Sequence, residues 1–521
     1  MSGFDRIALP GKLNEPERRV DILVIGGGPA GAAAARKAAR SGASVLLVDE
    51  NPLDPGLMGL DVPLWFGGRY TNEIQRPERL MEQVFAANPD LEAALDAGAE
   101  IALGVSCWGA WVPGWGLAAL PGAIAGLADS ERAWTVGFEA LVVAAGARDV
   151  ALAFGGWDQP GVMGARAFAS LVSTYDAFAG RRIAILGSGE LALQTARLAQ
   201  SKGVEIAAVI EVGATALSDF GDIPAIAGAV PVAAGGGIGG VTSLEIAAGP
   251  DRRAIDCDTI VEAISLTPAI ELLDVLGVDL AMQPTLGGYA PVSADGVSTS
   301  LSQVFVAGDA AGAPGGAPLA REDAALSGLL AARAALPSLG RGVHEPAAPQ
   351  TAAGPDAVAY QAAWLAAFNE ANAAGTIVCQ CEAVSREALL AVRPPAYLGP
   401  PSRAQSGRDL ARLLDDGPPN PDQIKRLTRA GMGPCQGRRC REQIALTLTA
   451  ASNLPPQRAP LTSYRAPVRP LPLKVLAAWD ETPAMSRGWD VWMGISGQWT
   501  PYDDIGTERE ALSAGILGGE G

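Results

Sequence analysis

Four of the six cysteines stand in two close pairs, a pattern able to bind a metal ion or an iron–sulfur cluster. One residue separates Cys379 from Cys381, and four residues separate Cys435 from Cys440. Four thiolates from two loops can hold an iron–sulfur cluster. Gaps of one and four are atypical of a zinc ribbon, although ligand type alone does not define the metal. The spacing therefore favours a cluster, with a zinc knuckle as the alternative.

The glycines of the second pair's loop and the three nearby arginines also suit an anionic cluster. The glycines free backbone N–H groups to point at sulfur, and the arginines offset the charge of four thiolates; they are Arg438, Arg439 and Arg441. Ser385 can cap a following helix, and Asn420 with Pro421 can open another, which Gly431 can close. The predicted module is helical, with the cysteine loop between its helices.

A glycine-rich turn near the N-terminus predicts a dinucleotide site. An apolar strand over residues 20–25 leads into Gly26, Gly28 and Gly31, and an alanine-rich helix follows over residues 32–41. The first glycine permits a tight turn, the second lets the backbone approach a pyrophosphate, and the third lets helix and strand pack closely. The loop also contributes Pro29 and Ala30. The pyrophosphate would rest on the N-terminus of the helix.

An acid at the end of the next strand completes this pattern. The strand over residues 44–48 ends at Asp49, which lies 18 residues after Gly31. A carboxylate at this distance is placed to bind a ribose hydroxyl, and Glu50 is the alternative for that contact.

A second unit of the same kind follows. A strand over residues 182–186 leads into Gly187 and Gly189, with Ala192 in place of the third glycine. A helix and another strand then end at Glu211. The chain thus contains two dinucleotide folds, although the second need not hold a ligand, because a fold can persist after its site is lost.

Two further strands complete the pattern of a flavoprotein. Residues 140–147 include an apolar strand that ends in Ala145 and Gly146, and a later strand ends in Gly308 and Asp309. In this order the segments resemble the glutathione reductase type of flavoprotein over residues 19–335. The resemblance implies that the first unit binds FAD, that the Gly-Asp segment completes the FAD site, and that the second unit binds NAD(P)H.

The remaining cysteines argue against a disulfide reductase. Cys107 and Cys257 are 150 residues apart, so no redox-active pair lies near the flavin segments. We expect both to be small buried hydrophobic residues.

The cysteine region narrows the resemblance to one group of enzyme subunits. Its motif is similar to the [2Fe–2S] domain of bacterioferritin-associated ferredoxin, fused here to a flavoprotein. The same layout is typical of the larger subunits of opine oxidase, hydrogen cyanide synthase and dye-linked proline or hydroxyproline dehydrogenase. The resemblance implies four cluster ligands, Cys379, Cys381, Cys435 and Cys440.

The resemblance also implies a function. A smaller flavoprotein (β) subunit would oxidise a C–N bond of an amino acid or opine, and this chain would pass the electrons through [2Fe–2S] and FAD to a respiratory acceptor. An FMN at a subunit interface, a small third subunit, and NAD or ATP in the second fold, held by Gly187, Gly189 and Glu211, stay open. The alternatives are a stand-alone NAD(P)H-dependent reductase and a mainly structural subunit.

Composition and charge limit the other possibilities. The net charge of −17 argues against nucleic acid and against an anionic membrane surface. The single histidine, His344, lies in a polar stretch, which argues against Ser-His-Asp chemistry. The uncharged run of residues 223–244 is rich in glycine and predicts a loop or a strand pair, not a membrane helix. We expect a cytoplasmic chain, peripheral to the inner membrane at most.

The predicted fold class is α/β, with two Rossmann-like domains followed by the small helical domain. The predicted order is an N-terminal extension (1–18), the FAD-binding domain in two parts (19–150 and 271–336), the inserted second dinucleotide domain (151–270), a linker with a docking helix (337–375), the cysteine domain (376–455) and a tryptophan-rich tail (456–521).

Overall fold

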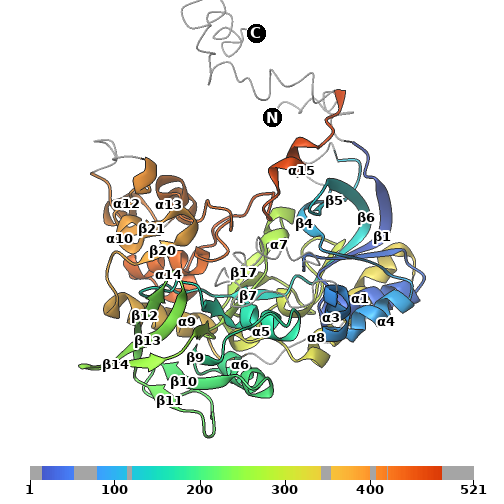
Figure 1. The fold of residues 1–521 in the computed structure, drawn as a ribbon. Coiled ribbons are helices and arrows are strands. Elements are labelled where there is room, and N and C mark those ends of the chain that lie inside the picture. The colour runs from blue at the N-terminus through green and yellow to red at the C-terminus, as the bar shows by residue number, and fades with distance from the viewer. Residues whose placement is uncertain are drawn as a thin grey trace, which may run out of the picture.

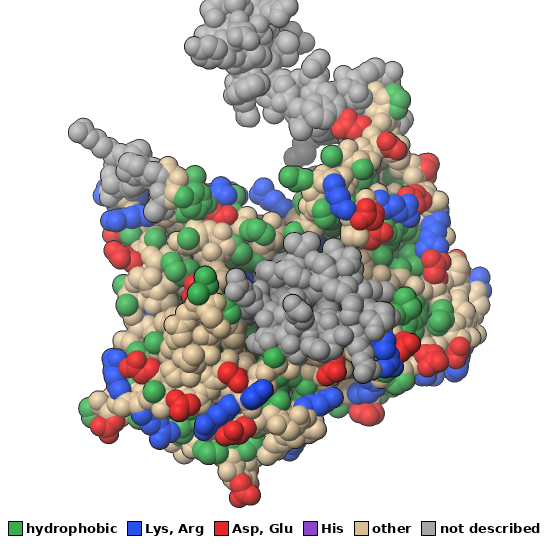
Figure 2. Space-filling model, viewed as in Figure 1, with side chains coloured by type: hydrophobic (Ala, Val, Ile, Leu, Met, Phe, Trp, Pro, Cys, Tyr) green, Lys and Arg blue, Asp and Glu red, His purple; other side chains and the backbone are tan. Residues whose placement is uncertain are grey.

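The structure, a computed structural model, describes residues 14–51, 79–113, 120–341, 354–398, 407–418 and 420–483. His344 and the tryptophans after residue 483 lie outside these ranges. Figure 1 shows two α/β units, with a helical C-terminal region beside the second. On the face drawn in Figure 2, acidic and basic side chains are interspersed.

A largely parallel sheet forms the core of the first unit. Its order is β3-β2-β1-β6-β5-β4, and β19 pairs with β6. The strands are β1 (Arg18–Ile25), β2 (Val45–Asp49), β3 (Glu100–Leu103), β4 (Ser106–Trp111), β5 (Ile124–Ala128), β6 (Ala133–Val143) and β19 (Val304–Val306). In β1, Ile22 is in register with Val45 on one side and with Ala140 on the other. The glycine-rich loop therefore leaves the centre of the sheet.

Successive residues of these strands point to opposite faces, and each face has its own cover. Ile22 and Val24 pack with the helices α1 (Pro29–Arg40), α4 (Pro89–Asp96) and α8 (Arg321–Ala335). Leu23 and Ile25 pack on the other side with α7 (Glu271–Leu276) and the antiparallel strands β4 and β5. This alternation is that of a strand buried on both faces.

The second unit repeats this design with a five-stranded parallel sheet. Its order is β11-β10-β9-β15-β8, with β8 (Val162–Gly164), β9 (Arg182–Leu186), β10 (Glu205–Glu211), β11 (Ala225–Ala227) and β15 (Thr259–Glu262). The helices α5 (Ala165–Ser173) and α6 (Glu190–Ser201) cover one face. The uncharged run forms β11, β12 (Val230–Gly237) and the start of β13 (Gly240–Ala248), which continues to β14 (Asp251–Asp256). The predicted strand pair is confirmed.

The C-terminal region shares the hydrophobic core on the other face of the second sheet with β12–β14. Ala184 and Leu186 of β9 belong to one hydrophobic core with Trp364 and Phe368 of α9 and with Ile444 of α14. The region contains α9 (Ala357–Ala371), β20 (Ile377–Cys379), β21 (Val384–Ser385), α10 (Arg386–Leu390), α12 (Leu410–Asp416), α13 (Pro421–Thr428) and α14 (Arg441–Ala451). The cysteine region and the second unit therefore share a core.

Two helix starts in this region follow the sequence prediction, and one helix end does not. Ser385 Oγ accepts from the Ala388 N–H at 3.0 Å, and Asn420 Oδ1 accepts from the Gln423 N–H at 3.0 Å. The expected stop at Gly431 is wrong: α13 ends at Thr428, and Arg429 adopts the left-handed conformation with φ of 62°. Gly431 instead donates its N–H to the Cys379 sulfur at 3.4 Å.

The remaining elements are short. They are α3 (Leu80–Ala87), β7 (Ala147–Asp149) paired with β16 (Leu266–Pro268), β17 (Leu280–Gln283) paired with β18 (Gly288–Pro291), and α15 (Leu473–Ala477). Within the described ranges, no helix is both long enough and apolar enough to cross a membrane.

Candidate functional site

The first glycine-rich loop borders a cavity of about 250 Å³. A Cβ on Gly26 would overlap the Ala144 carbonyl oxygen, and one on Gly31 would overlap the Gly26 carbonyl oxygen. Gly28 has nothing within 4 Å of an added Cβ, and α1 begins there with no side-chain cap and with Pro29 in its first turn. The N-terminus of α1 is thus open to a ligand, as a pyrophosphate site requires.

The two candidate ribose acids occupy different positions on this cavity. Asp49 accepts the Gly27 N–H at 2.5 Å and the Asn51 N–H at 2.7 Å, and burial raises its pKa. Glu50 forms an ion pair with Arg469, whose Nε lies 2.5 Å from its carboxylate. Both acids line the cavity, so either carboxylate is placed to contact the ribose of a ligand bound there.

Of the two later segments predicted to contribute to the flavin site, only one lines this cavity. Ala145 and Gly146 line it. Gly308 lies instead against Ala30, where its added Cβ would come within 2.9 Å of the Ala30 Cβ. Asp309 accepts from the Leu319 N–H at 2.9 Å; burial raises its pKa, and the Arg166 guanidinium opposes that rise. Arg166 itself lines the cavity, so the charge that acts on Asp309 belongs to a residue of this site.

The second glycine-rich loop is engaged by the protein itself. Glu211 is 2 % exposed and accepts from the hydroxyls of Ser188 and Tyr360, both at 2.5 Å. The Tyr360 hydroxyl in turn accepts the Ser188 N–H at 3.0 Å. Burial and the Glu211 carboxylate raise the pKa of Tyr360, so this phenol remains a hydrogen-bond donor. Tyr360 of α9 thus hydrogen-bonds to Glu211, the carboxylate that would otherwise be available to bind a ribose.

The rest of this second loop shows features for and against a ligand. Gly189 has nothing within 4 Å of an added Cβ, so its backbone is open. A Cβ on Gly187 would overlap the Ala263 carbonyl oxygen, as expected for the tight turn. However, Glu190 occupies the first turn of α6, where its negative charge opposes a pyrophosphate.

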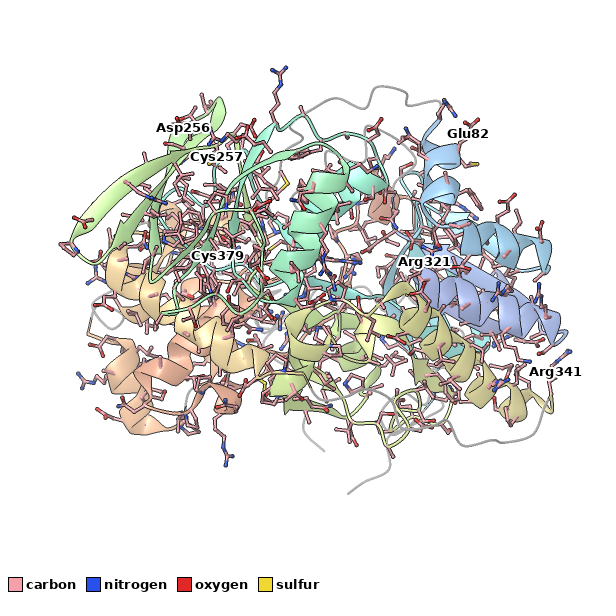
Figure 3. All side chains as sticks on the ribbon, turned by 90° about the horizontal axis from the view of Figure 1, so that it is seen from below. Glu82, Asp256, Cys257, Arg321, Arg341 and Cys379 are labelled. Carbon is pink, nitrogen blue, oxygen red and sulfur yellow. The ribbon has the colours of Figure 1, made fainter. Side chains whose placement is uncertain are left out.

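The four paired cysteines meet as two hydrogen-bonded couples. Cys379 interacts with Cys440, and Cys381 with Cys435, so each couple joins one residue from each loop. Cys381 is exposed and the other three are buried. Figure 3 shows Cys379 between strands of the second unit and helices of the C-terminal region.

The surroundings favour the thiolate at one sulfur of each couple, Cys379 and Cys435, while the pKa of the donating partner, Cys440 or Cys381, is raised by its hydrogen bond and by burial. The Cys381 thiol and the N–H groups of Arg439 and Gly437 donate to Cys435, and although burial opposes them, they lower its pKa to about 5. Cys379 accepts from Cys440 and from the Gly431 N–H, which lower its pKa against the effect of burial. Thiolates are the form in which cysteine binds metal.

In the part of the chain that the structure describes, no group of three or more His, Cys, Asp or Glu side chains is arranged to hold a metal ion. The hydrogen bonds join the thiols in couples, and electrostatic interactions also act between the couples.

The cysteine loop also forms part of the cavity at the first glycine-rich loop. Arg438 and Arg439, which stand between Cys435 and Cys440, both line that cavity. Arg148 fixes this junction: it donates to the Arg438 carbonyl oxygen at 2.8 Å and forms ion pairs with Glu442 at 2.6 Å and Glu271 at 3.0 Å. Its Nη2 also donates to the Tyr464 hydroxyl at 3.0 Å. The two candidate sites are therefore contiguous.

Sequence reasoning missed Arg148, Tyr360 and Arg469. Arg148 stands two residues after Gly146, at the predicted end of a strand, which could have drawn attention to it. Tyr360 lies on the predicted docking helix, and Arg469 lies in the segment that follows the cysteine domain. Their partners are more than 100 residues away, so no local pattern identifies them.

Cys107 and Cys257 are unpaired and buried, as expected, at 7 % and 4 % exposure. Burial raises the pKa of each thiol to about 12, so neither is a reactive thiolate.

Two family models match the chain. The model described as pyridine nucleotide-disulphide oxidoreductase matches residues 20–324. The sarcosine oxidase A3 domain matches residues 406–480, which overlap the second half of the cysteine region.

Similar proteins cover most of the chain. An opine oxidase subunit of Agrobacterium tumefaciens (strain Ach5) is 28 % identical over 501 residues, covering 88 % of this chain and 91 % of that protein. Hydrogen cyanide synthase subunit HcnB of Pseudomonas aeruginosa is 26 % identical over 468 residues, covering 80 % and 90 %. The crystal structure of L-proline dehydrogenase from P. horikoshii has a TM-score of 0.60 at 20 % identity, covering 89 % of this chain and 81 % of that one, which shows the same fold.

Proposed function

The chain belongs to the pyridine nucleotide-disulphide oxidoreductase family, and we propose that it is the electron-transfer subunit of a hetero-oligomeric amine oxidase or dehydrogenase. Relatives named as subunits of opine oxidase and of hydrogen cyanide synthase match it over most of both chains, which supports a place in a complex. In this proposal, a smaller flavoprotein subunit oxidises the C–N bond of an opine or amino acid.

The cavity at the first glycine-rich loop suits FAD. Gly26, Gly28 and Gly31 keep the N-terminus of α1 open for a pyrophosphate, and Asp49 and Glu50 are in reach of a ribose. Pro29 and Ala30 form the first turn of α1, and Ala145 and Gly146 line the same cavity. Gly308 and Asp309 lie behind Ala30 and Arg166. FAD bound here would accept and release electrons.

The four paired cysteines suit a [2Fe–2S] cluster. A cluster of this type takes four thiolates. Two couples of thiols, with N–H groups directed at Cys379 and Cys435, form a set of donors for it. A zinc ion held by the same four thiolates is the alternative, which metal analysis distinguishes from the cluster.

One observation carries the proposal: the loop that bears two of the four cysteines also lines the cavity of the first unit. A chain that only bound a flavin would not need this contact. A chain that moves electrons between two centres needs them close together in fixed positions, which Arg148 supports through its contacts with Arg438, Glu442 and Glu271.

The test is the visible spectrum of the full chain purified without oxygen, with iron, sulfide and flavin assayed on the same sample. We expect two irons, two sulfides and one FAD per chain, with bleaching by dithionite and none by NADH. Zinc in place of iron would refute the cluster, and a flavin-free chain that binds no added FAD would refute the cavity assignment.

A stand-alone NAD(P)H reductase is the alternative that the open backbone at Gly189 favours. The engagement of Glu211 by Tyr360 and Ser188, together with Glu190 in the first turn of α6, opposes it. Rapid bleaching of the flavin by NADH, without any partner, would support this alternative.

A further inference from the structure

Arg438 belongs to both candidate sites at once. It lies between Cys435 and Cys440 in the chain, and it lines the cavity of the first unit. Its side chain is 6 % exposed and is fixed by two carbonyl oxygens: Nε donates to Cys435 at 3.0 Å and Nη1 to Val468 at 3.4 Å. Among the described residues, its Nη2 has no hydrogen-bond partner.

A buried guanidinium nitrogen without a partner is unfavourable, more so than a neutral donor, because a charged group loses more hydration. Native structures therefore nearly always supply such a partner. A ligand in the cavity that Arg438 lines can provide an acceptor for this nitrogen.

The neighbours of Arg438 indicate which part of a dinucleotide lies there. Asp49 and Glu50, the two acids in the ribose-binding position, line the same cavity, and Arg469 next to Val468 pairs with Glu50. Val105 and Cys107 add apolar wall. A ribose acid marks the adenosine end of a bound dinucleotide. Arg438 therefore faces the adenosine end of the cavity.

We propose that Arg438 is a cofactor-binding residue that donates to the adenosine half of FAD from within the cysteine loop. The acceptor class is a purine ring nitrogen or a ribose oxygen. This proposal rests on the assignment of FAD to the cavity. The proposal also couples the two sites. A metal or cluster that orders the loop between Cys435 and Cys440 would also position the Arg438 guanidinium, and FAD binding would in turn favour the ordered loop, because such coupling is reciprocal.

The experiment titrates flavin-free full-length chain with FAD and, separately, with FMN, and follows quenching of flavin fluorescence. FMN is the comparison because it lacks the adenosine half. The variants are Arg438→Met, which keeps bulk and removes the donors, and Arg438→Lys, which keeps the charge. The matched control is Arg386→Met, a buried arginine of the same region that contacts Asn369 and Asn372 and does not line the cavity.

We expect Arg438→Met to weaken FAD binding by roughly ten- to a hundredfold, as for loss of a charged hydrogen bond. Arg438→Lys should lie between this variant and the wild type, the FMN affinity should stay unchanged, and Arg386→Met should keep the wild-type FAD affinity. An FAD affinity of Arg438→Met within threefold of wild type would overturn the proposal. Equal losses for FAD and FMN, or equal losses in Arg386→Met, would overturn it too, because they would show general damage to the fold. A wild-type chain that binds no FAD would refute the cavity assignment itself.

Discussion

Replacing Arg148 with methionine should strongly destabilise the protein, because Arg148 is the buried cation at the junction of the three regions. Its side chain is 15 % exposed and is shared by Glu442, 19 % exposed, and Glu271, 3 % exposed. Removing one partner of a buried ion pair leaves an uncompensated charge, and such changes cost about 3–5 kcal/mol.

The pKa of Glu271 reports the combined effect of burial and the neighbouring arginines, among which Arg148 contributes most. Burial alone would raise it, but Arg148, followed by Arg469 and Arg438, brings it to about 2 from the usual 4.5. At 1.36 kcal/mol per pH unit, this difference corresponds to about 3 kcal/mol. A lowered pKa in the folded state stabilises the fold above about pH 4.5, and this stabilisation disappears as the pH falls towards 2. Without Arg148 the pKa of Glu271 should rise.

The assay is urea unfolding of wild type and Arg148→Met, followed by tryptophan fluorescence and circular dichroism between pH 7 and pH 3. We expect a difference of about 3–5 kcal/mol at pH 7 that narrows below pH 5, because a protonated Glu271 no longer needs the cation. The control is Arg182→Met, which removes an exposed ion pair with Glu205 and should change stability by less than about 1 kcal/mol. A difference below about 1 kcal/mol for Arg148→Met, or one that does not vary with pH, would refute the reasoning.

Three other changes test separate parts of the structure. Gly31→Ala should prevent correct folding of the first unit because its Cβ would overlap the Gly26 carbonyl, whereas Gly28→Ala should fold and bind FAD less tightly; equal losses of thermal stability would contradict this contrast. Cys435→Ser should abolish bound iron while Cys257→Ser retains it, as measured by metal analysis; iron retained in Cys435→Ser would rule out the proposed ligand set. Tyr360→Phe should lower the free energy of unfolding by about 1–3 kcal/mol, because the buried Glu211 loses a donor, and an unchanged unfolding midpoint would show that this contact is weak.

The local patterns of the sequence predicted the elements that carry them. Strand, glycine turn, helix and acid occur in order in both units; β9 spans the predicted residues and β10 ends at Glu211, as the sequence predicts. The caps at Ser385 and Asn420 depend on neighbouring residues only, so they could also be predicted. The end of α13 could not, because Arg429 takes the left-handed conformation and pairs with Glu382, 47 residues earlier.

The arrangement of the site depends on contacts that no local pattern encodes. Arg148 and Glu442 are 294 residues apart, and Tyr360 and Glu211 are 149 apart. From the sequence alone, Arg148 and Tyr360 could equally well be ordinary surface residues. The sequence predicted the cysteines and the glycines as groups, but only the fold shows that one loop belongs to both sites.

The core shared by the second unit and the C-terminal region has a consequence for synthesis. Chains emerge from the ribosome N-terminal end first, and domains generally fold as units in that order. Here the core on one face of the sheet formed by β8, β9, β10 and β15 is shared by β12–β14 and by α9 and α14, and α14 ends at Ala451. While the last third of the chain is still being made, the part of this core that α9 and α14 contribute is missing. We therefore expect that truncation before α14 exposes apolar residues of this core and yields insoluble protein.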